Sequence, residues 1–298
     1  MRIVNISLVA ILLMFSACTE STENTIPTKT LKPKKVEVED TASNSVQYVK
    51  DFLNKNFSNN PNIKSIDVKV TNTIAVKGHS PWSAYFIKLD AILKKDDRKV
   101  SQKMLWFSDG KIVTKELYDV KTGKDLKDSV SLPFKDEYYK KSNLIYGHAN
   151  SKHKVVIFSD PLCPFCRSFV PAAIEYMKKE PNKFAVYYYH FPLPGLHPAA
   201  VELVKAAVVL ENKGVKDVVL KLYKVEVDAK EKSIDKILKA FNSVMKSNLK
   251  PSDINIQSVI SHLNQDMDIA NEVMVQGTPT MFFDGKLDKT KNKYKEVK

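Results

Sequence analysis

Two cysteines separated by two residues constrain this sequence more than any other feature. Cys163-Pro164-Phe165-Cys166 follows the apolar run Val155-Val156-Ile157-Phe158 and precedes a stretch whose apolar residues have helical spacing. The pattern predicts a strand, a tight turn and a helix that begins at the pair. Thiols so placed can alternate between dithiol and disulfide with little backbone movement. The pair is therefore expected to be a redox couple.

The predicted helix gives the two sulfurs different roles. Free N–H groups and the positive end of the helix dipole point at Cys163, which favours a thiolate there. Pro164 fits the first helical turn because it has no N–H to leave unpaired. Cys163 is expected to attack, and Cys166, further into the helix and more buried, is expected to resolve. Phe165 adds no positive charge, so we expect an intermediate redox potential.

Three other interpretations of the pair are weaker. A structural zinc site needs about four ligands, but there is no second cysteine pair, and His153, His190 and His197 have no matching spacing. A static disulfide across so short a loop would remove little chain entropy. Accidental spacing of two reduced cysteines is the third alternative. We expect no metal and no cofactor.

The third cysteine, Cys18, follows an N-terminal apolar stretch. Arg2 precedes apolar residues that run to Phe15, and small residues lead to Cys18. This pattern is typical of a secretory signal peptide over residues 1–17. It also resembles a bacterial lipoprotein cleavage box, which implies lipidation of Cys18 and a periplasmic protein anchored to the membrane by lipid. The alternative is an ordinary signal peptide, with Cys18 removed or left free.

Composition excludes one class of partner. The formal net charge of +13 comes from lysines spread along the chain, and only three arginines are present. Nucleic-acid recognition favours clustered arginines interleaved with aromatic residues, so no nucleic-acid partner is expected. The 298 residues, 43% of them hydrophobic, suggest two folded domains.

The chain divides into five predicted segments. Residues 1–17 form the signal peptide, and 18–44 form a lipidated tether too polar to fold. Residues 45–130 form a small α+β, cystatin-like domain of one helix and several strands, with strands predicted at 66–76, 83–93, 99–106 and 111–120. Residues 131–150 are a linker with a helix near 136–141, and 151–298 form an α/β domain with a helical insertion at about 197–270.

Gly277-Thr278-Pro279 is the second part of the predicted site. A proline before the apolar strand at 280–283 can simply start that strand. Beside a Cys-X-X-Cys turn, a cis-proline would instead expose backbone groups next to the reactive sulfur and pair with an extended substrate chain. Thr278 and Pro279 are therefore the candidate substrate-binding residues.

These motifs resemble the thioredoxin fold, and more closely the periplasmic disulfide isomerases of the DsbC/DsbG type. The run Phe158-Ser159-Asp160-Pro161-Leu162 before the pair, Pro171 after it, and Thr278 before Pro279 carry the likeness. In the N-terminal domain, Leu105–Lys111 and Leu117–Val120 are similar to the dimerisation domain of those proteins. The resemblance implies a homodimer whose two sites face a cleft that excludes partner oxidases.

The sequence also departs from that family. Ile157 stands where thioredoxins have a buried acid, which leaves Asp160 as a weak candidate for proton transfer; otherwise it is a turn or cap residue. The stretch from His190 to Pro198 and its helical sequel look more like the insertion of the DsbA oxidases. Only 19 residues follow Pro279, and no closing amphipathic helix is evident.

The resemblance implies a thiol:disulfide interchange protein that isomerises or reduces wrong disulfides in exported proteins. Isomerisation needs the reduced pair, and a DsbD-like membrane reductant is implied as electron donor. The alternative is a DsbA-like oxidase that is re-oxidised by a DsbB-like partner. A third possibility is a non-catalytic lipoprotein that binds exported client proteins.

Overall fold

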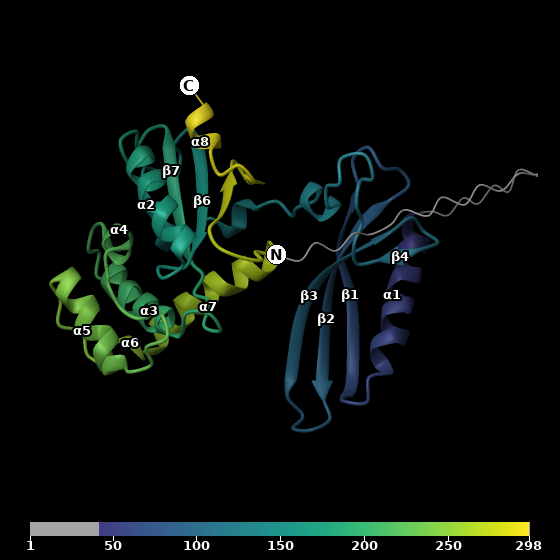
Figure 1. Cartoon of the computed structure of the whole chain (residues 1–298), viewed down its shortest axis with the longest axis horizontal. Coiled ribbons are helices and arrows are strands. Elements are labelled where there is room, and N and C mark those ends of the chain that lie inside the picture. The colour runs from purple at the N-terminus through teal and green to yellow at the C-terminus, as the bar shows by residue number, and fades with distance from the viewer. Residues whose placement is uncertain (1–41, 298) are drawn as a thin grey trace, which may run out of the picture. The chain divides into compact units, whose positions relative to one another are not determined.

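The computed structural model describes residues 42–297 (Figure 1). The predicted signal peptide, Cys18 and nearly all of the predicted tether lie outside the described residues. No helix within 42–297 is long and apolar enough to cross a membrane.

The N-terminal module consists of one helix and one antiparallel sheet. Helix α1 (Ala42–Ser58) runs alongside a sheet in the order β1-β2-β3-β4, as Figure 1 shows. The strands are β1 (Ile63–Ala75), β2 (Ser83–Leu93), β3 (Lys99–Ser108) and β4 (Val113–Thr114). Alternate residues of β2 face opposite sides of the sheet, and Tyr85, Ile87 and Leu89 share a core with Leu53 of α1.

This module has the helix and antiparallel strands that the sequence predicts, with one exception. The strand expected at 111–120 is wrong, because only Val113 and Thr114 form a strand and Tyr118 makes no more than an isolated bridge with Asp125. Asp119 Oδ1 accepts the N–H groups of Lys121 and Thr122, at 3.0 and 2.7 Å, so the chain turns there instead. The cystatin-like type and the domain boundaries stay predictions.

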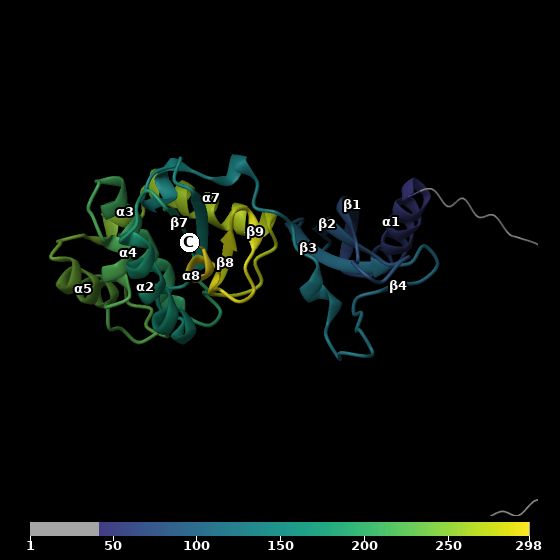
Figure 2. The same cartoon turned by 90° about the horizontal axis from the view of Figure 1, so that it is seen from above.

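The second folded part is built on a mixed sheet in the order β5-β7-β6-β8-β9. Figure 2 labels three of its strands, β7, β8 and β9. Its central strand β6 (His153–Ser159) pairs in parallel with β7 (Phe184–His190) and antiparallel with β8 (Thr280–Phe283). The edge strands are β5 (Leu144–Tyr146) and β9 (Lys286–Leu287). Helix α2 (Pro164–Lys178) makes the crossover from β6 to β7, which explains the parallel pairing.

Helices cover both faces of this sheet, which is why the β6 sequence is continuously apolar. Val155 and Ile157 pack with α2 on one face. Val156 and Phe158 pack on the other face with Ile269 of α7 (Gln257–Glu272). The predicted α/β domain is thus a layered structure with its central strand fully buried.

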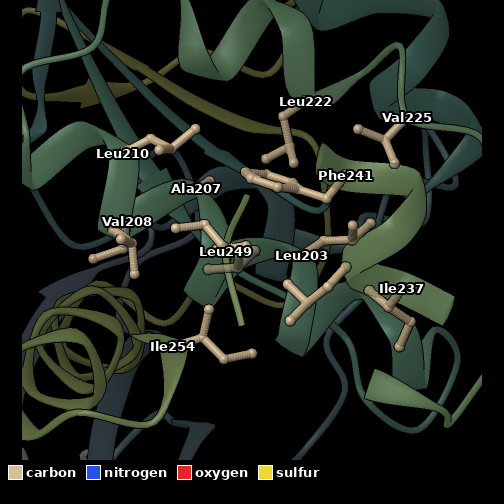
Figure 3. Close-up of a cluster of buried hydrophobic side chains, with 14 of the residues drawn as sticks. Leu203, Ala207, Val208, Leu210, Leu222, Val225, Ile237, Phe241, Leu249 and Ile254 are labelled. Carbon is tan, nitrogen blue, oxygen red and sulfur yellow. The ribbon is translucent and has the colours of Figure 1, made fainter. Parts of the chain in front are cut away.

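The helical segment between β7 and β8 has a core of its own. It comprises α3 (Pro198–Asn212), α4 (Val218–Leu222), α5 (Ile234–Met245), α6 (Pro251–Ile254) and α7. Figure 3 shows Leu203, Leu222 and Phe241 converging from three of these helices. Helix α7 contributes to this core through Val259 and also covers the sheet, so the predicted insertion at about 197–270 includes one helix of the sheet layers.

The predicted linker helix near 136–141 is wrong. The chain there forms two short 3₁₀ turns, η2 (Asp136–Tyr138) and η3 (Lys141–Asn143), before it enters β5. The Tyr189 hydroxyl accepts the Lys140 N–H at 3.2 Å and donates to the Tyr138 carbonyl. These tertiary hydrogen bonds engage backbone groups that an α-helix would pair internally.

A buried polar cluster links this segment to the sheet and the insertion. The Asp266 carboxylate accepts the Asn143 side-chain N–H at 2.7 Å and the His190 backbone N–H at 2.9 Å. The His190 ring contacts Glu211 of α3 at 3.1 Å. Burial raises the pKa of Asp266 to about 7, although its hydrogen bonds and His190 oppose this shift.

The C-terminal segment ends in a single short helix, α8 (Lys293–Glu296). Tyr294 is buried there against Tyr176 of α2, with ring centroids 5.3 Å apart. The sequence shows no long closing amphipathic helix, and the structure has this four-residue helix at the corresponding place.

Phe134 provides a test of how the linker is held. It is 3% exposed and packs against Phe158, Tyr189 and Phe282, with centroid separations of 5.6 to 6.1 Å. We expect Phe134→Ala to lower the free energy of unfolding of this domain by about 3–5 kcal/mol, because the cavity would adjoin the sheet core. Nine of the twelve tyrosines lie after residue 130, so the tyrosine near-UV circular dichroism in denaturant reports mainly on this domain.

Phe165→Ala is the matched control, because that ring is 75% exposed. It should change the unfolding free energy by less than about 0.5 kcal/mol. Equal effects of the two substitutions would show that the linker does not belong to the core.

Candidate active site

The turn after β6 places Cys163 at the start of α2. Asp160 organises this turn: its side chain accepts the Leu162 N–H at 2.7 Å and its carbonyl accepts the Cys163 N–H at 3.2 Å. Cys163 is the N-cap residue, and Pro164 opens the helix as predicted. The Cys163 sulfur therefore lies at the positive end of the α2 dipole, where negative charge is favoured.

The two thiols lie in different surroundings. Both are free, but Cys163 is 6% exposed whereas Cys166 is fully buried in the core between the sheet and α2. Burial raises the pKa of Cys166 to about 11, and hydrogen bonding from the Ser159 and Thr278 hydroxyls partly offsets that rise. Cys166 is thus a protonated thiol at neutral pH, in the position expected of a resolving cysteine.

Thr278 and Pro279 lie beside the pair. Strand β8 pairs with β6 so that Thr280 lies opposite Phe158, which brings the preceding residues to the end of β6 where α2 starts. The Thr278–Pro279 bond is cis, as the resemblance implied. The Cys163 sulfur is 3.7 Å from the Thr278 carbonyl oxygen, although 115 residues separate them in the sequence.

Asp160 has a structural role. Its carboxylate is fully buried and also accepts the Leu193 N–H at 2.8 Å, while the His197 Nδ1 lies 3.0 Å away. These contacts join the active-site turn to the loop that leads into α3. The turn-residue interpretation of Asp160 therefore fits the structure better than proton transfer. The pairing with His197 had no signal in the sequence spacing.

Sequence reasoning also missed a group of buried hydroxyls in the same core as Cys166. Ser159 Oγ lies 2.6 Å from the Tyr223 hydroxyl, which lies 2.8 Å from the Tyr188 hydroxyl. Tyr188 comes from β7 and Tyr223 directly follows α4. The unusual number of tyrosines in β7 was the only sequence sign of this group.

The described residues hold no cluster suited to a metal. Within 42–297, no three or more histidine, cysteine, aspartate or glutamate side chains are grouped so that they could bind an ion.

Comparison with known proteins identifies the family. A sequence model of the thioredoxin family matches residues 140–298, which is more than half of the chain. The protein belongs to the thioredoxin family. None of the curated proteins compared with it matches.

Solved structures with some likeness to this chain include the following three. A thioredoxin-like oxidoreductase from Silicibacter pomeroyi is 20% identical, with coverage of 50% of this chain and 84% of that chain and a TM-score of 0.40. ScsC from Proteus mirabilis is 19% identical, with coverages of 51% and 67% and a TM-score of 0.42. Oxidised BdbD from Bacillus subtilis is 16% identical, with coverages of 56% and 92% and a TM-score of 0.41.

The difference between the two thiols can be tested by alkylation. In Cys163→Ser, we expect iodoacetamide to label Cys166 very slowly at pH 7, because a thiol with a pKa of about 11 is only about one part in ten thousand thiolate there. The labelling rate should rise about tenfold per pH unit towards pH 11. Mass spectrometry of peptides distinguishes Cys166 from Cys18.

The matched variant is Cys166→Ser, which leaves Cys163 at the N-terminus of α2. Cys163 should label faster at pH 7, since its sulfur lies at the N-terminus of α2 and is partly exposed, whereas Cys166 is fully buried. Similar neutral-pH rates for the two cysteines would contradict the assignment of attacking and resolving sulfurs.

Proposed function

We propose that this protein is a thiol:disulfide oxidoreductase that acts on disulfides of exported proteins through Cys163 and Cys166. One observation carries the proposal: the Cys163 sulfur lies at the start of α2, 3.7 Å from the Thr278 carbonyl, while Cys166 is buried behind it. A sulfur placed between a helix N-terminus and a backbone edge can react with a disulfide in an extended substrate chain.

The reaction follows from these positions. The Cys163 thiolate attacks one sulfur of a substrate disulfide, forms a mixed disulfide, and releases the other substrate sulfur as a thiolate. Cys166 then attacks the Cys163 sulfur, which forms the Cys163–Cys166 disulfide and releases the substrate. Two electrons pass from the dithiol to the substrate. If a second substrate thiol attacks instead, the pair stays reduced and the disulfide is isomerised.

We infer that isomerisation or reduction is the working direction. Phe165 at the middle of the motif adds no charge that would stabilise the Cys163 thiolate further, and Thr278 precedes Pro279 as in the DsbC/DsbG type. A DsbD-like membrane protein would then supply electrons. The helical block of α3 to α6 favours the alternative, a DsbA-like oxidase with a DsbB-like partner, because the sequence of that block resembles the DsbA insertion.

The N-terminal sequence, which lies outside the described residues, supports a periplasmic location for the protein. The N-terminal leader and Cys18 support export and a lipid anchor in the periplasm. The tether is proposed to run from Cys18 to the start of α1 at Ala42, three residues before the predicted start of the domain at 45. The N-terminal module is proposed to pair two copies. Among the described strands, β1 has a partner on one side only, so its outer edge is available for pairing.

Two variants test the chemistry. Cys166→Ser should accumulate mixed disulfides with exported proteins, because Cys163 still attacks and the resolving thiol is absent. Cys163→Ser should accumulate none. Acid quenching of cells, alkylation and non-reducing electrophoresis measure both. Absence of any mixed disulfide in Cys166→Ser would contradict the oxidoreductase function. It would favour the alternative of a non-catalytic protein that binds exported client proteins.

The same quenched cells report the direction of electron flow. A mostly reduced Cys163–Cys166 pair in the unmodified protein is expected for an isomerase or reductase. A mostly oxidised pair would support the oxidase alternative. Deleting the membrane reductant should shift an isomerase towards the oxidised form.

The mature protein should be a lipidated dimer. Light scattering of the full-length protein in detergent, corrected for bound detergent, should give twice the mass of one chain. Mass spectrometry of the N-terminal peptide should show a lipid on Cys18. A monomer would contradict the proposed pairing of two sites but would leave the proposed thiol chemistry unaffected. An unmodified Cys18 would contradict the proposed lipid anchor.

A further inference from the structure

Three buried hydroxyls form a connected group next to the resolving sulfur. Ser159 ends β6, Tyr188 lies in β7 and Tyr223 follows α4 in the helical insertion, and their side chains are 0%, 2% and 7% exposed. The Ser159 and Tyr223 oxygens are 2.6 Å apart, and the Tyr223 and Tyr188 oxygens are 2.8 Å apart. Tyr188 and Tyr223 share a core with Cys166. Hydroxyls so deeply buried need partners, and here they supply them to one another.

This group lies next to Cys166, where no carboxylate of the described residues is free to interact with the sulfur. Cys166 must lose its proton to attack the mixed disulfide, and it is surrounded by apolar side chains. Ile157, at the position expected for a buried acid, is apolar and fully buried. The Asp160 carboxylate is already occupied by two backbone N–H groups and His197. The polar groups that remain near Cys166 are therefore hydroxyls and a backbone N–H: the Ser159 hydroxyl, which belongs to this group, the Thr278 hydroxyl and the Asp160 backbone.

The group can direct its hydrogens towards the sulfur. In both oxygen–oxygen contacts either atom can be the donor, so the chain can run from Tyr188 through Tyr223 to Ser159. In that orientation the Ser159 hydroxyl is left free to donate to Cys166, and its hydrogen bond favours the thiolate over the thiol. Hydrogen bonds to an ionised acceptor are about twice as strong as neutral ones. The chain is thus most favourable while Cys166 carries negative charge.

We propose that Tyr188 and Tyr223 are positioning residues for the resolving step, because they hold the Ser159 hydroxyl as a donor to the Cys166 sulfur. This proposal rests on the proposed function and deepens it. In the step, Cys166 loses its proton to solvent and bonds to the Cys163 sulfur. The bond between Cys163 and the substrate breaks, and the substrate sulfur leaves as a thiolate that takes up a proton. The helical insertion thereby contributes to catalysis through Tyr223.

The test separates the two chemical steps. The reduced full-length protein in detergent is mixed with oxidised glutathione, quenched with acid at intervals and analysed by mass spectrometry. In Tyr223→Phe, the rate of mixed-disulfide formation at Cys163 should stay within about twofold of wild type. Its resolution by Cys166 should slow about tenfold, the effect of losing one hydrogen bond in the chain of donors. The glutathione adduct should therefore accumulate, and Ser159→Ala should act in the same direction.

Tyr189→Phe is the matched control. Tyr189 neighbours Tyr188 on β7 but belongs to the core on the opposite face of the sheet, where its hydroxyl contacts the Tyr138 carbonyl and the Lys140 N–H. Loss of that hydroxyl also leaves buried backbone groups without a partner, but it should not change the resolution rate. A structural disturbance of the domain would affect control and test variants alike.

The outcomes distinguish this proposal from the function on which it rests. If wild-type protein forms neither adduct nor internal disulfide, the oxidoreductase function fails. If wild type reacts in two steps and Tyr223→Phe resolves at the wild-type rate, the positioning role is wrong and the function stands. Equal slowing of both steps in Tyr223→Phe would also overturn the positioning role, because an effect through Cys166 is confined to resolution.

Discussion

The burial of Cys166 between the sheet and α2 is the constraint on which the site depends. Because the side chain at that position belongs to the core, the first turn of α2 has a fixed orientation. Cys163, one turn earlier, is then held at the N-terminus of the helix with its sulfur near Thr278. The same burial keeps the second thiol protonated at neutral pH. The burial of Cys166 thus sets both the positions of the two sulfurs and the difference in their exposure.

The helical insertion is more than an independent addition to the domain. It has a core of its own, yet it also contacts the end of β6 and the start of α2. Tyr223 enters the hydroxyl group near Cys166, and the Arg167 guanidinium donates to the Val225 carbonyl just beyond it. Asp160 and His197 add a link through the loop before α3. A change in the insertion can therefore alter redox chemistry without touching the cysteines.

Local sequence patterns were reliable where the local residues themselves decide the structure. The apolar run, the Cys-Pro-Phe-Cys turn and the periodic helix after it predicted β6 and α2. The strand after Pro279 also occurs as predicted. The linker helix failed because the Tyr189 hydroxyl of β7 engages the backbone of that segment and the linker residue Phe134 packs against the Tyr189 ring. The strand at 111–120 failed because the Asp119 side chain turns the backbone.

The sequence by itself determined a Cys-X-X-Cys pair at a strand–helix junction, in a layered α/β domain of the thioredoxin family. It could do so because residue spacing and hydrophobic periodicity can be read from the sequence without knowing any tertiary contact. Only the tertiary structure decided the surroundings of the pair: which carbonyl meets Cys163, what occupies the Asp160 carboxylate, and which hydroxyls face Cys166. Those groups come from segments tens of residues apart, and only the packing of the sheet and the helical insertion brings them within hydrogen-bonding distance.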